Sequence, residues 1–305
     1  MTCKVMASRP RCPQTAARYI RVQADKVIAG MQTAAGSTMK RPSRWTPLGA
    51  LLREWRAARG LSQMTLALHA GTSPRHLSYV ETGRSQPSRG LLTALAEALE
   101  LPLRERNELL VAAGYAPAFP ASSLDAPEMG LVSAAVSLIL EEHEPYPAFA
   151  FDRNWDLIQA SAGMTRLLEA VRPGGPKNRN ILLQLFDPDD MRPAIANWSE
   201  VASELLRHLH HEIRRRPTDP RPRTLLARLT AFPGVPDAWR RREPGRPPLP
   251  VVTTALHGPD GELRFFSTLT TFVGASEVVA DELRIEAMHP ADEATRAFCR
   301  ALAQR

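Results

Sequence analysis

Short helical patterns follow one another between residues 47 and 114. The first helix is predicted by four apolar residues at positions i, i+3, i+4 and i+7, namely Leu48, Leu51, Leu52 and Trp55. Ser62 and Ser73 are predicted N-caps of a second and a third helix. Two further helices, from Ser88 to about Leu99 and from Leu103 to Ala113, complete the pattern. The segment therefore predicts an all-α unit of five helices.

A short helix, a turn at Gly71 and a second short helix give the spacing of a helix-turn-helix. In the helix that begins at Pro74, Leu77 and Val80 face inward, so its opposite face is available for the major groove of DNA. The residues expected at the DNA are Gln63, Ser73, Pro74, Arg75, His76, Ser78, Tyr79 and Arg84. Arg75 suits a guanine edge, and backbone phosphates suit Gln63 and Arg84, whereas His76 and Ser78 fit solvated flank positions equally well.

The segment from Arg56 to Arg84 resembles the XRE family of Cro/repressor-type regulators. The resemblance joins five residues at the family's spacings, which are Gln63, Gly71, Leu77, Glu81 and Gly83. It implies that Gln63, Pro74, Arg75 and Tyr79 face DNA. It also implies an ion pair between Arg56 and Glu81 that ties the first helix to the third.

The longer segment that follows mixes strand and helix patterns. Two hairpins are predicted, one around a turn at 152–154 and one joining 251–256 to 263–272. Between them, 160–171 is predicted to be helical, and the acidic run 187–190 is predicted to cap a long helix that includes Trp198 and Leu209. These elements predict an α+β fold in which helices pack on a sheet.

This segment resembles the ligand-binding domain of MmyB-like regulators. The resemblance rests on Asp152–Trp155, Ile195–Trp198, Leu263–Phe272, Asp281–Glu286 and His289–Thr295. It implies a PAS-like fold that holds a small apolar or fatty-acid-like ligand. The residues expected to line the pocket, each of which also suits a plain core position, are Phe149, Phe151, Trp155, Leu183, Phe186, Trp198, Phe266, Leu269 and Phe272.

The net charge of +7 belongs mainly to the N-terminal segment. Residues 1–46 carry a net charge of +8, residues 47–114 carry +2, and the remainder carries −3. The expected organisation is a disordered basic tail at 1–45, a DNA-binding domain at 46–116, a linker at 117–128 and a ligand-binding domain at 129–305. Two interpretations of the tail stay open: a basic arm that contacts phosphates, or an upstream extension from a misplaced start codon.

Other chemistry has little support. Three cysteines without a C-x-x-C pair favour a reducing, cytoplasmic setting, and no apolar run is long enough for a membrane span. His208 and His211 are spaced to share a metal, and His210 and Glu212 lie beside them, but no third ligand stands at a fixed spacing, and Arg214 to Arg216 suggest a solvated basic helix end. Because no nucleophile motif is present, we do not expect an enzyme. We also expect no metal and no other cofactor, apart from a bound fatty-acid-like ligand.

The leading hypothesis is a homodimeric transcriptional regulator that binds a double-stranded DNA operator. Its operator binding would be modulated by a small apolar ligand in the C-terminal domain. Two alternatives remain: a helical interaction module for a protein partner, and a ligand-converting enzyme in the C-terminal domain.

Overall fold

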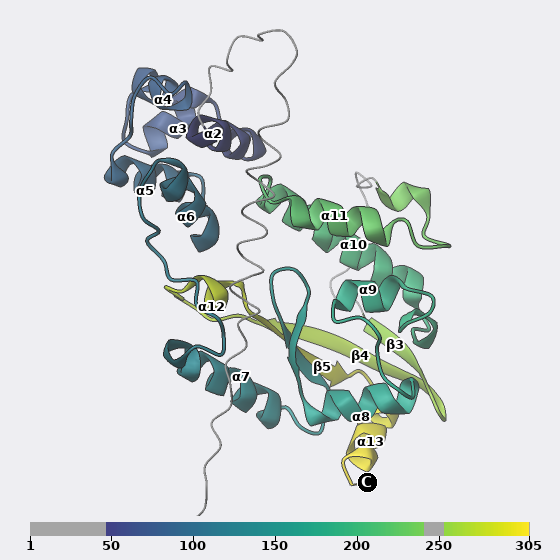
Figure 1. The fold of residues 1–305 in the computed structure, drawn as a ribbon. Coiled ribbons are helices and arrows are strands. Elements are labelled where there is room, and N and C mark those ends of the chain that lie inside the picture. The colour runs from purple at the N-terminus through teal and green to yellow at the C-terminus, as the bar shows by residue number, and fades with distance from the viewer. Residues whose placement is uncertain (1–46, 241–252, 305) are drawn as a thin grey trace, which may run out of the picture. The chain divides into compact units, whose positions relative to one another are not determined.

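The computed structural model describes residues 47–240 and 253–304, and residues 45–305 form one compact unit. The expectation for residues 1–45 and the start of the second hairpin, Val251 and Val252, lie outside the described residues. The N-terminal part is all helical (Figure 1), with α2 at Pro47–Ala58, α3 at Gln63–His69, α4 at Pro74–Glu81, α5 at Arg89–Ala98 and α6 at Leu103–Ala112.

Local signals determine where these helices begin. The hydroxyls of Ser62, Ser73 and Ser88 each accept a hydrogen bond from a backbone N–H in the first turn of the helix that follows. Gly71 has a φ of 64°, the left-handed conformation that the turn between α3 and α4 requires. One hydrophobic core then joins the five helices, with Leu52, Leu66, Leu77 and other side chains fully buried.

The C-terminal part is built on one antiparallel sheet with the strand order β2-β1-β5-β4-β3. The strands are β1 at Ala148–Phe151, β2 at Leu157–Ala160, β3 at Thr253–Gly258, β4 at Gly261–Thr270 and β5 at Arg284–Pro290. The helices are α7 at Gly130–Glu142, α8 at Ala162–Val171, α9 at Ile181–Phe186, α10 at Trp198–Arg215, α11 at Pro220–Leu229, α12 at Val278–Glu282 and α13 at Glu293–Leu302, with short 3₁₀ turns at 127–129, 192–194 and 237–240. An all-α unit of five helices is thus followed by a PAS-like α+β unit, which confirms the predicted fold class.

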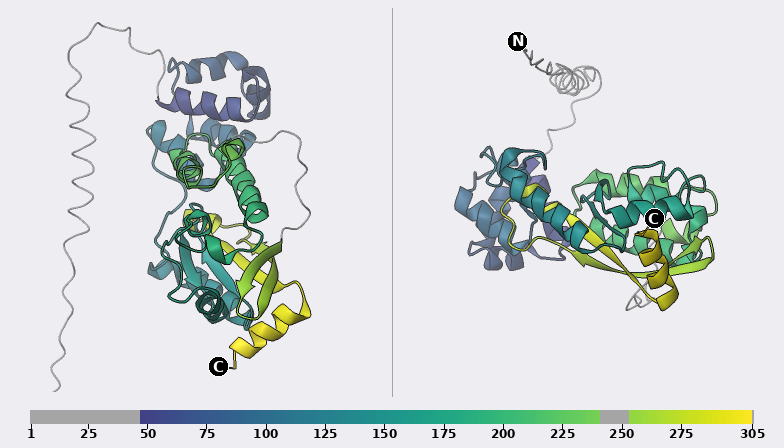
Figure 2. Two further views of the ribbon diagram at one scale, coloured as in Figure 1. Left: turned by 90° about the vertical axis from the view of Figure 1, so that its right-hand side faces the viewer. Right: turned by 90° about the horizontal axis from the view of Figure 1, so that it is seen from below.

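The two faces of the sheet pack against different helices. On one face, Ala148, Ala150 and Ile285 pack against Val136 and Leu140 of α7. The other face carries Phe149, Phe151, Phe265 and Met288, which share a core with α8, α10 and α13. A turned view shows α13 near the C-terminus, where it packs against β4 and α8 (Figure 2).

Three features of this region differ from the sequence predictions. The acidic run 187–190 does not cap the long helix; instead a 3₁₀ turn at 192–194 intervenes and Asn197 is the N-cap of α10. Asp190 is buried and accepts hydrogen bonds from the backbone N–H groups of Lys177 and Asn178. The apolar stretch 181–186 is a helix, and α7, α11, α13 and strand β5 were not predicted.

Gly49 allows α2 and α4 to approach closely. A Cβ at this position would lie 2.0 Å from the backbone oxygen of Glu81, which is too close for any real contact.

We therefore expect Gly49→Ala to lower the free energy of unfolding by about 1–3 kcal/mol in a urea titration. Gly90 in α5 is the matched control, because nothing lies within 4 Å of an added Cβ there. Gly90→Ala should stabilise by about 0.5 kcal/mol, and equal effects of the two variants would contradict the close-approach explanation.

Candidate functional site

The orientation of α4 depends on a buried carboxylate at its C-terminal end. Glu81 is fully buried, and its Oε1 accepts a hydrogen bond from Arg56 Nε at 2.8 Å. Its Oε2 accepts bonds from Arg56 Nη2 at 3.2 Å and from Gln63 Nε2 at 2.8 Å. The pair of Arg56 and Glu81 is the one that the resemblance implies. Gln63 joins it, so this residue connects α3 to α4 in addition to the DNA-facing role expected of it.

The opposite side of α4 presents a cationic and aromatic cluster. The exposed Arg75 donates from Nε to the hydroxyl of Tyr79 at 3.0 Å. The guanidinium carbons of Arg75 and Arg84 lie 5.5 and 6.0 Å from the centre of the Tyr79 ring. Ser73 and Pro74 are exposed, while His76 and Ser78 are half-buried. Two arginines around one ring give this face hydrogen-bond donors, and phosphates and guanine edges offer the matching acceptors.

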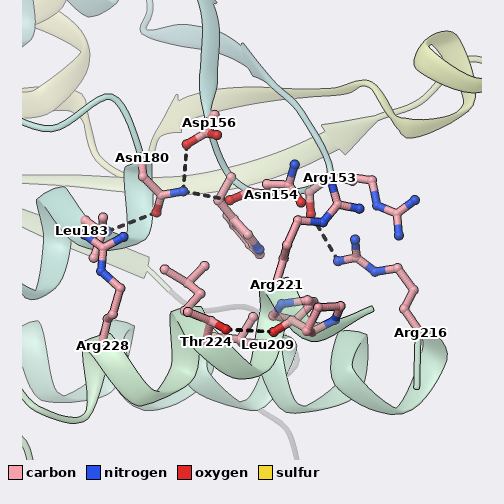
Figure 3. A pocket seen from close by; sticks show the side chains of 14 residues that line it. Arg153, Asn154, Asp156, Asn180, Leu183, Leu209, Arg216, Arg221, Thr224 and Arg228 are labelled. Carbon is pink, nitrogen blue, oxygen red and sulfur yellow. Dashed lines mark hydrogen bonds between the residues drawn. The ribbon is translucent and has the colours of Figure 1, made fainter. Parts of the chain in front are cut away.

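A pocket of about 380 Å³ lies in the C-terminal part, between the β1–β2 turn and helices α9, α10 and α11. Its walls include the apolar side chains of Trp155, Leu183, Leu209 and Leu225. Four arginines also line it: Arg153, Arg216, Arg221 and Arg228. Figure 3 shows Arg228 at one end of the pocket and Arg153 and Arg216 at the other. The pocket therefore combines an apolar interior with two basic ends.

The β1–β2 turn shapes one wall of the pocket. Asp152 Oδ1 accepts bonds from the backbone N–H groups of Asn154 and Asp156, which closes the turn. Trp155 is thereby held at a φ of 68°, a conformation that bulky residues rarely adopt. Asn180, the N-cap of α9, donates from Nδ2 to Asp156 and to the carbonyl of Asn154 (Figure 3). The turn and α9 are thus held together beside the pocket.

The structure does not bring together the nine residues expected to line a cavity. Two of them, Trp155 and Leu183, line this pocket. Phe151 stacks on Trp155 with ring centres 5.1 Å apart, and Phe149 is buried on the same face of the sheet. Phe186 and Trp198 meet edge-to-face in the adjoining core.

The last three predicted pocket residues require correction. Phe266 stacks on His289, which contacts His143 at the end of α7, and Phe272 packs in the α7 core. Phe266 lies on the face of the sheet opposite Phe149, because side chains alternate along a strand, and Phe272, beyond the end of β4, packs on that opposite face with α7. Leu269 shares the face of Phe149 but is 57% exposed and belongs to none of the described cores. Phe266 and Phe272 therefore cannot line one cavity with Phe149.

The arginines that line the pocket were not among the residues predicted from the sequence. The prediction of a solvated basic helix end holds for the exposed Arg214 and Arg215 but is wrong for Arg216, whose side chain is 6% exposed. Arg216 is the C-cap residue after α10, where the chain leaves the helical conformation, and its Nη2 donates to the carbonyl of Arg153 in the β1–β2 turn at 3.1 Å. A run of three arginines carries no local signal that one of them is buried.

Arg153 is the centre of a buried ionic cluster. Its Nη2 donates to Glu105 at 2.7 Å and to Asp219 at 3.0 Å, and its Nη1 donates to Glu282. Arg104 forms a bidentate pair with the same Glu282, at 2.7 and 2.6 Å. Burial opposes a charge on Arg153, but the fields of Glu105 and Glu282 outweigh it and raise the pKa of Arg153.

Two further members of the cluster have shifted pKa values. Burial would raise the pKa of Asp219, but the hydrogen bonds and the charge of Arg221, helped by Arg153, lower it to about 2. Burial and the neighbouring charge of Arg153 lower the pKa of Arg216. Among the described residues, Nε and Nη1 of Arg216 have no hydrogen-bond partner, and neither does Nε of Arg153. The cluster thus holds cations with spare donors beside the pocket.

Within residues 47–240 and 253–304, no group of three or more His, Cys, Asp or Glu is arranged to hold a metal ion. In the same ranges, no helix combines the length and apolar character that crossing a membrane requires.

These features define a class: a helix-turn-helix DNA-binding region joined to an α+β sensor region that contains a pocket. The chain belongs to the MmyB-like transcription regulator ligand binding domain family, whose model matches residues 132–302. Residues 47–109 match a helix-turn-helix domain model. The chain therefore carries a helix-turn-helix domain followed by the ligand-binding domain of MmyB-like transcription regulators.

Individual relatives match about a quarter of the chain or less. The chain is 37% identical over 84 residues to the uncharacterized HTH-type transcriptional regulator RghRB of Bacillus subtilis (strain 168); the match covers 27% of this chain and 58% of that relative. It is 39% identical to the restriction-modification controller protein C.AhdI of Aeromonas hydrophila, with a TM-score of 0.20, over 20% of this chain and 92% of the other. It is 33% identical to the clp gene regulator ClgR of C. glutamicum, with a TM-score of 0.20, over 25% of this chain and 92% of the other.

The lowered pKa of Asp219 makes the stability of the protein dependent on pH. Its folded pKa of about 2 lies below the ordinary value of 3.8, so the charged form stabilises the fold above pH 4 and this contribution is lost as the pH falls toward 2. We expect Asp219→Asn to lower the free energy of unfolding by roughly 2 kcal/mol at pH 7 and by progressively less between pH 4 and pH 2.

Urea unfolding at a series of pH values measures this effect. Asp237→Asn, at a side chain that is 90% exposed, is the control and should leave stability unchanged. A deficit in Asp219→Asn that stays constant down to pH 2 would show that charge is not the cause.

Proposed function

We propose that the protein binds operator DNA as a cytoplasmic homodimer through α4, and that a fatty-acid-like ligand in the pocket modulates this binding. The observation that carries the proposal is the exposed face of α4, where Arg75 and Arg84 flank Tyr79 beside capped helix ends. We propose a division into a DNA-binding domain at 46–116, a linker at 117–128 and a ligand-binding domain at 129–305.

The proposed DNA interface separates two roles. Arg75 lies in the first turn of α4, the part of a recognition helix that enters the major groove, and we propose that it reads a guanine edge. Gln63, Ser73, Pro74 and Arg84 lie at the ends of α3 and α4, where side chains and helix N–H groups suit phosphates. His76, Ser78 and Tyr79 complete the proposed surface. Because residues 47–114 carry a net charge of only +2, we propose that affinity comes from these placed groups and from dimerisation, to which residues 1–46 add if they form a basic arm.

The composition of the pocket supports an apolar ligand that carries one anionic group. The side chains of Leu183, Leu209 and Leu225 suit an alkyl chain, and the arginines at the two ends suit a carboxylate. A volume of about 380 Å³ falls within the range of small-molecule sites. A fatty-acid-like molecule has both properties, so we assign this class of ligand to the pocket.

The assignment of Arg75 is tested on a duplex selected by the full-length protein from a random-sequence library. Loss of a bidentate contact to a base costs about 1–3 kcal/mol, so Arg75→Ala should weaken binding to this duplex about 10- to 100-fold. Binding to an unrelated duplex should change much less. Fluorescence anisotropy at constant salt measures both dissociation constants.

Two further variants complete the test. Arg75→Lys keeps the charge without the planar fork and should also lose preference for the selected duplex. Arg300→Ala removes an exposed charge from α13 and should leave both affinities unchanged. If Arg75→Ala still binds the selected duplex as the unmodified protein does, α4 is not the reading helix.

The location of the ligand is tested by blocking the pocket. Thr224 and Ala227 are both exposed on α11, but only Thr224 lines the pocket. We expect Thr224→Trp to weaken binding of dodecanoate at least tenfold, because the indole occupies the space of the alkyl chain, whereas Ala227→Trp should bind as the unmodified protein does. Isothermal titration calorimetry gives both affinities. Equal dodecanoate affinity in the two variants would place the ligand elsewhere.

A further inference from the structure

Hydrogen bonds and ion pairs join the helix-turn-helix region to the ligand-binding region. Each of the four hydrophobic cores of the described residues stays within one region: the first spans residues 48–115, and the other three contain no residue before 132. The contacts across the boundary instead include the ion pairs of Arg104 and Glu105 in α6 with Glu282 and Arg153. Backbone bonds add to them, from Val278 to Pro120 and from Ser122 to the carboxylate of Glu277.

The pocket and the DNA-binding region share one side chain of this junction. Arg153 lines the pocket, and the same guanidinium donates to Glu105 of α6. Its side chain is 7% exposed and that of Glu105 is 1% exposed, so water screens their interaction little. A change in charge at the pocket therefore acts on α6 through a contact that solvent does not weaken.

We infer that the charge of the bound ligand, rather than the filling of the pocket, is the signal that changes operator affinity. The inference rests on the proposed function, because it requires a ligand in this pocket. Arg216 lines the pocket, and its Nη1 lies 3.6 Å from Asp219 Oδ2 without forming a hydrogen bond among the described residues, so its charge is incompletely satisfied and can attract an anionic oxygen in the pocket. The anion would lie beside Asp219, which already accepts bonds from Arg153 and Arg221, and would compete with it for the same cations.

The alkyl part of the ligand has no comparable route. The leucines that line the pocket contact the core formed by α9, α10 and α11, which includes no residue of the helix-turn-helix region. An uncharged ligand of the same length should fill the pocket and leave the ionic cluster unchanged. The two parts of an amphipathic ligand then have different effects: the chain supplies affinity, and the charge supplies the response.

Dodecanoate and dodecan-1-ol are matched probes for this inference. Calorimetry on the full-length protein measures whether each one binds, and anisotropy measures operator affinity at saturating concentrations of each. We expect dodecanoate to change the dissociation constant of the selected duplex about tenfold, within the usual range of coupling between two sites. Dodecan-1-ol, although bound, should change it less than twofold. An equal response to both saturating probes would overturn the inference and leave the proposed function standing.

Glu105→Gln tests whether the response to the ligand passes from Arg153 to α6 through Glu105. It removes the charge from the α6 end of the junction while keeping its shape, and Glu105 does not line the pocket. Dodecanoate affinity should stay within twofold of the unmodified value, while the tenfold response of operator affinity is lost. Glu97→Gln removes an exposed charge from α5, and its operator affinity should show the full tenfold response to dodecanoate. A full response in Glu105→Gln would also overturn the inference.

Two checks keep the outcomes distinct. If circular dichroism shows that Glu105→Gln is unfolded, Arg104→Gln replaces it, because the pair of Arg104 and Glu282 is more exposed and its loss is milder. If neither probe binds the full-length protein, the assignment of a fatty-acid-like ligand has failed and the inference fails with it.

Discussion

The structure depends on the burial of one guanidinium among three carboxylates. Arg153 lies at the tip of the β1–β2 turn and bonds to Glu105, Glu282 and Asp219, which belong to segments far apart in the chain. A buried charge is tolerated only when it is paired, and removal of one partner typically costs about 3–5 kcal/mol. This requirement holds α6, α12 and the start of α11 around the turn. It also places the DNA-binding region and the pocket on either side of the same side chain.

A polar junction has consequences that an apolar one would lack. Apolar contacts are non-directional and respond little to the charge of a ligand, whereas hydrogen-bonded ion pairs have fixed geometry and respond strongly to a new charge nearby. The shared acceptor Asp219, with its low pKa, and the incompletely bonded Arg216 make the cluster sensitive on the side of the pocket. The apolar cores on either side stay separate, so each region keeps its own stability.

The helix-turn-helix shows how far local signals can determine structure. Ser62, Ser73 and Gly71 act within a few residues of their own positions, so the ends of α3 and α4 were predictable from sequence. The pairing of Arg56 with Glu81 followed from the family resemblance, but the participation of Gln63 did not. That contact depends on how close α3 comes to the end of α4, which involves packing of the whole helical unit.

The sequence by itself determined the class of fold, both hairpins and helix α4, because caps, turns and side-chain periodicity are properties of neighbouring residues. It predicted a pocket lined by aromatic residues, but only the tertiary structure decided which of them share a face: Phe266 and Phe149 lie on opposite sides of the sheet. The pocket and the ionic cluster also emerged only there. Arginine is expected in water, and nothing adjacent to Arg153 in the chain encodes its carboxylate partners, which the fold brings from 48 to 129 residues away. The carboxylates that pair with Arg216, Glu212 and Asp219, lie within four residues of it, but only the fold buries them together with Arg153.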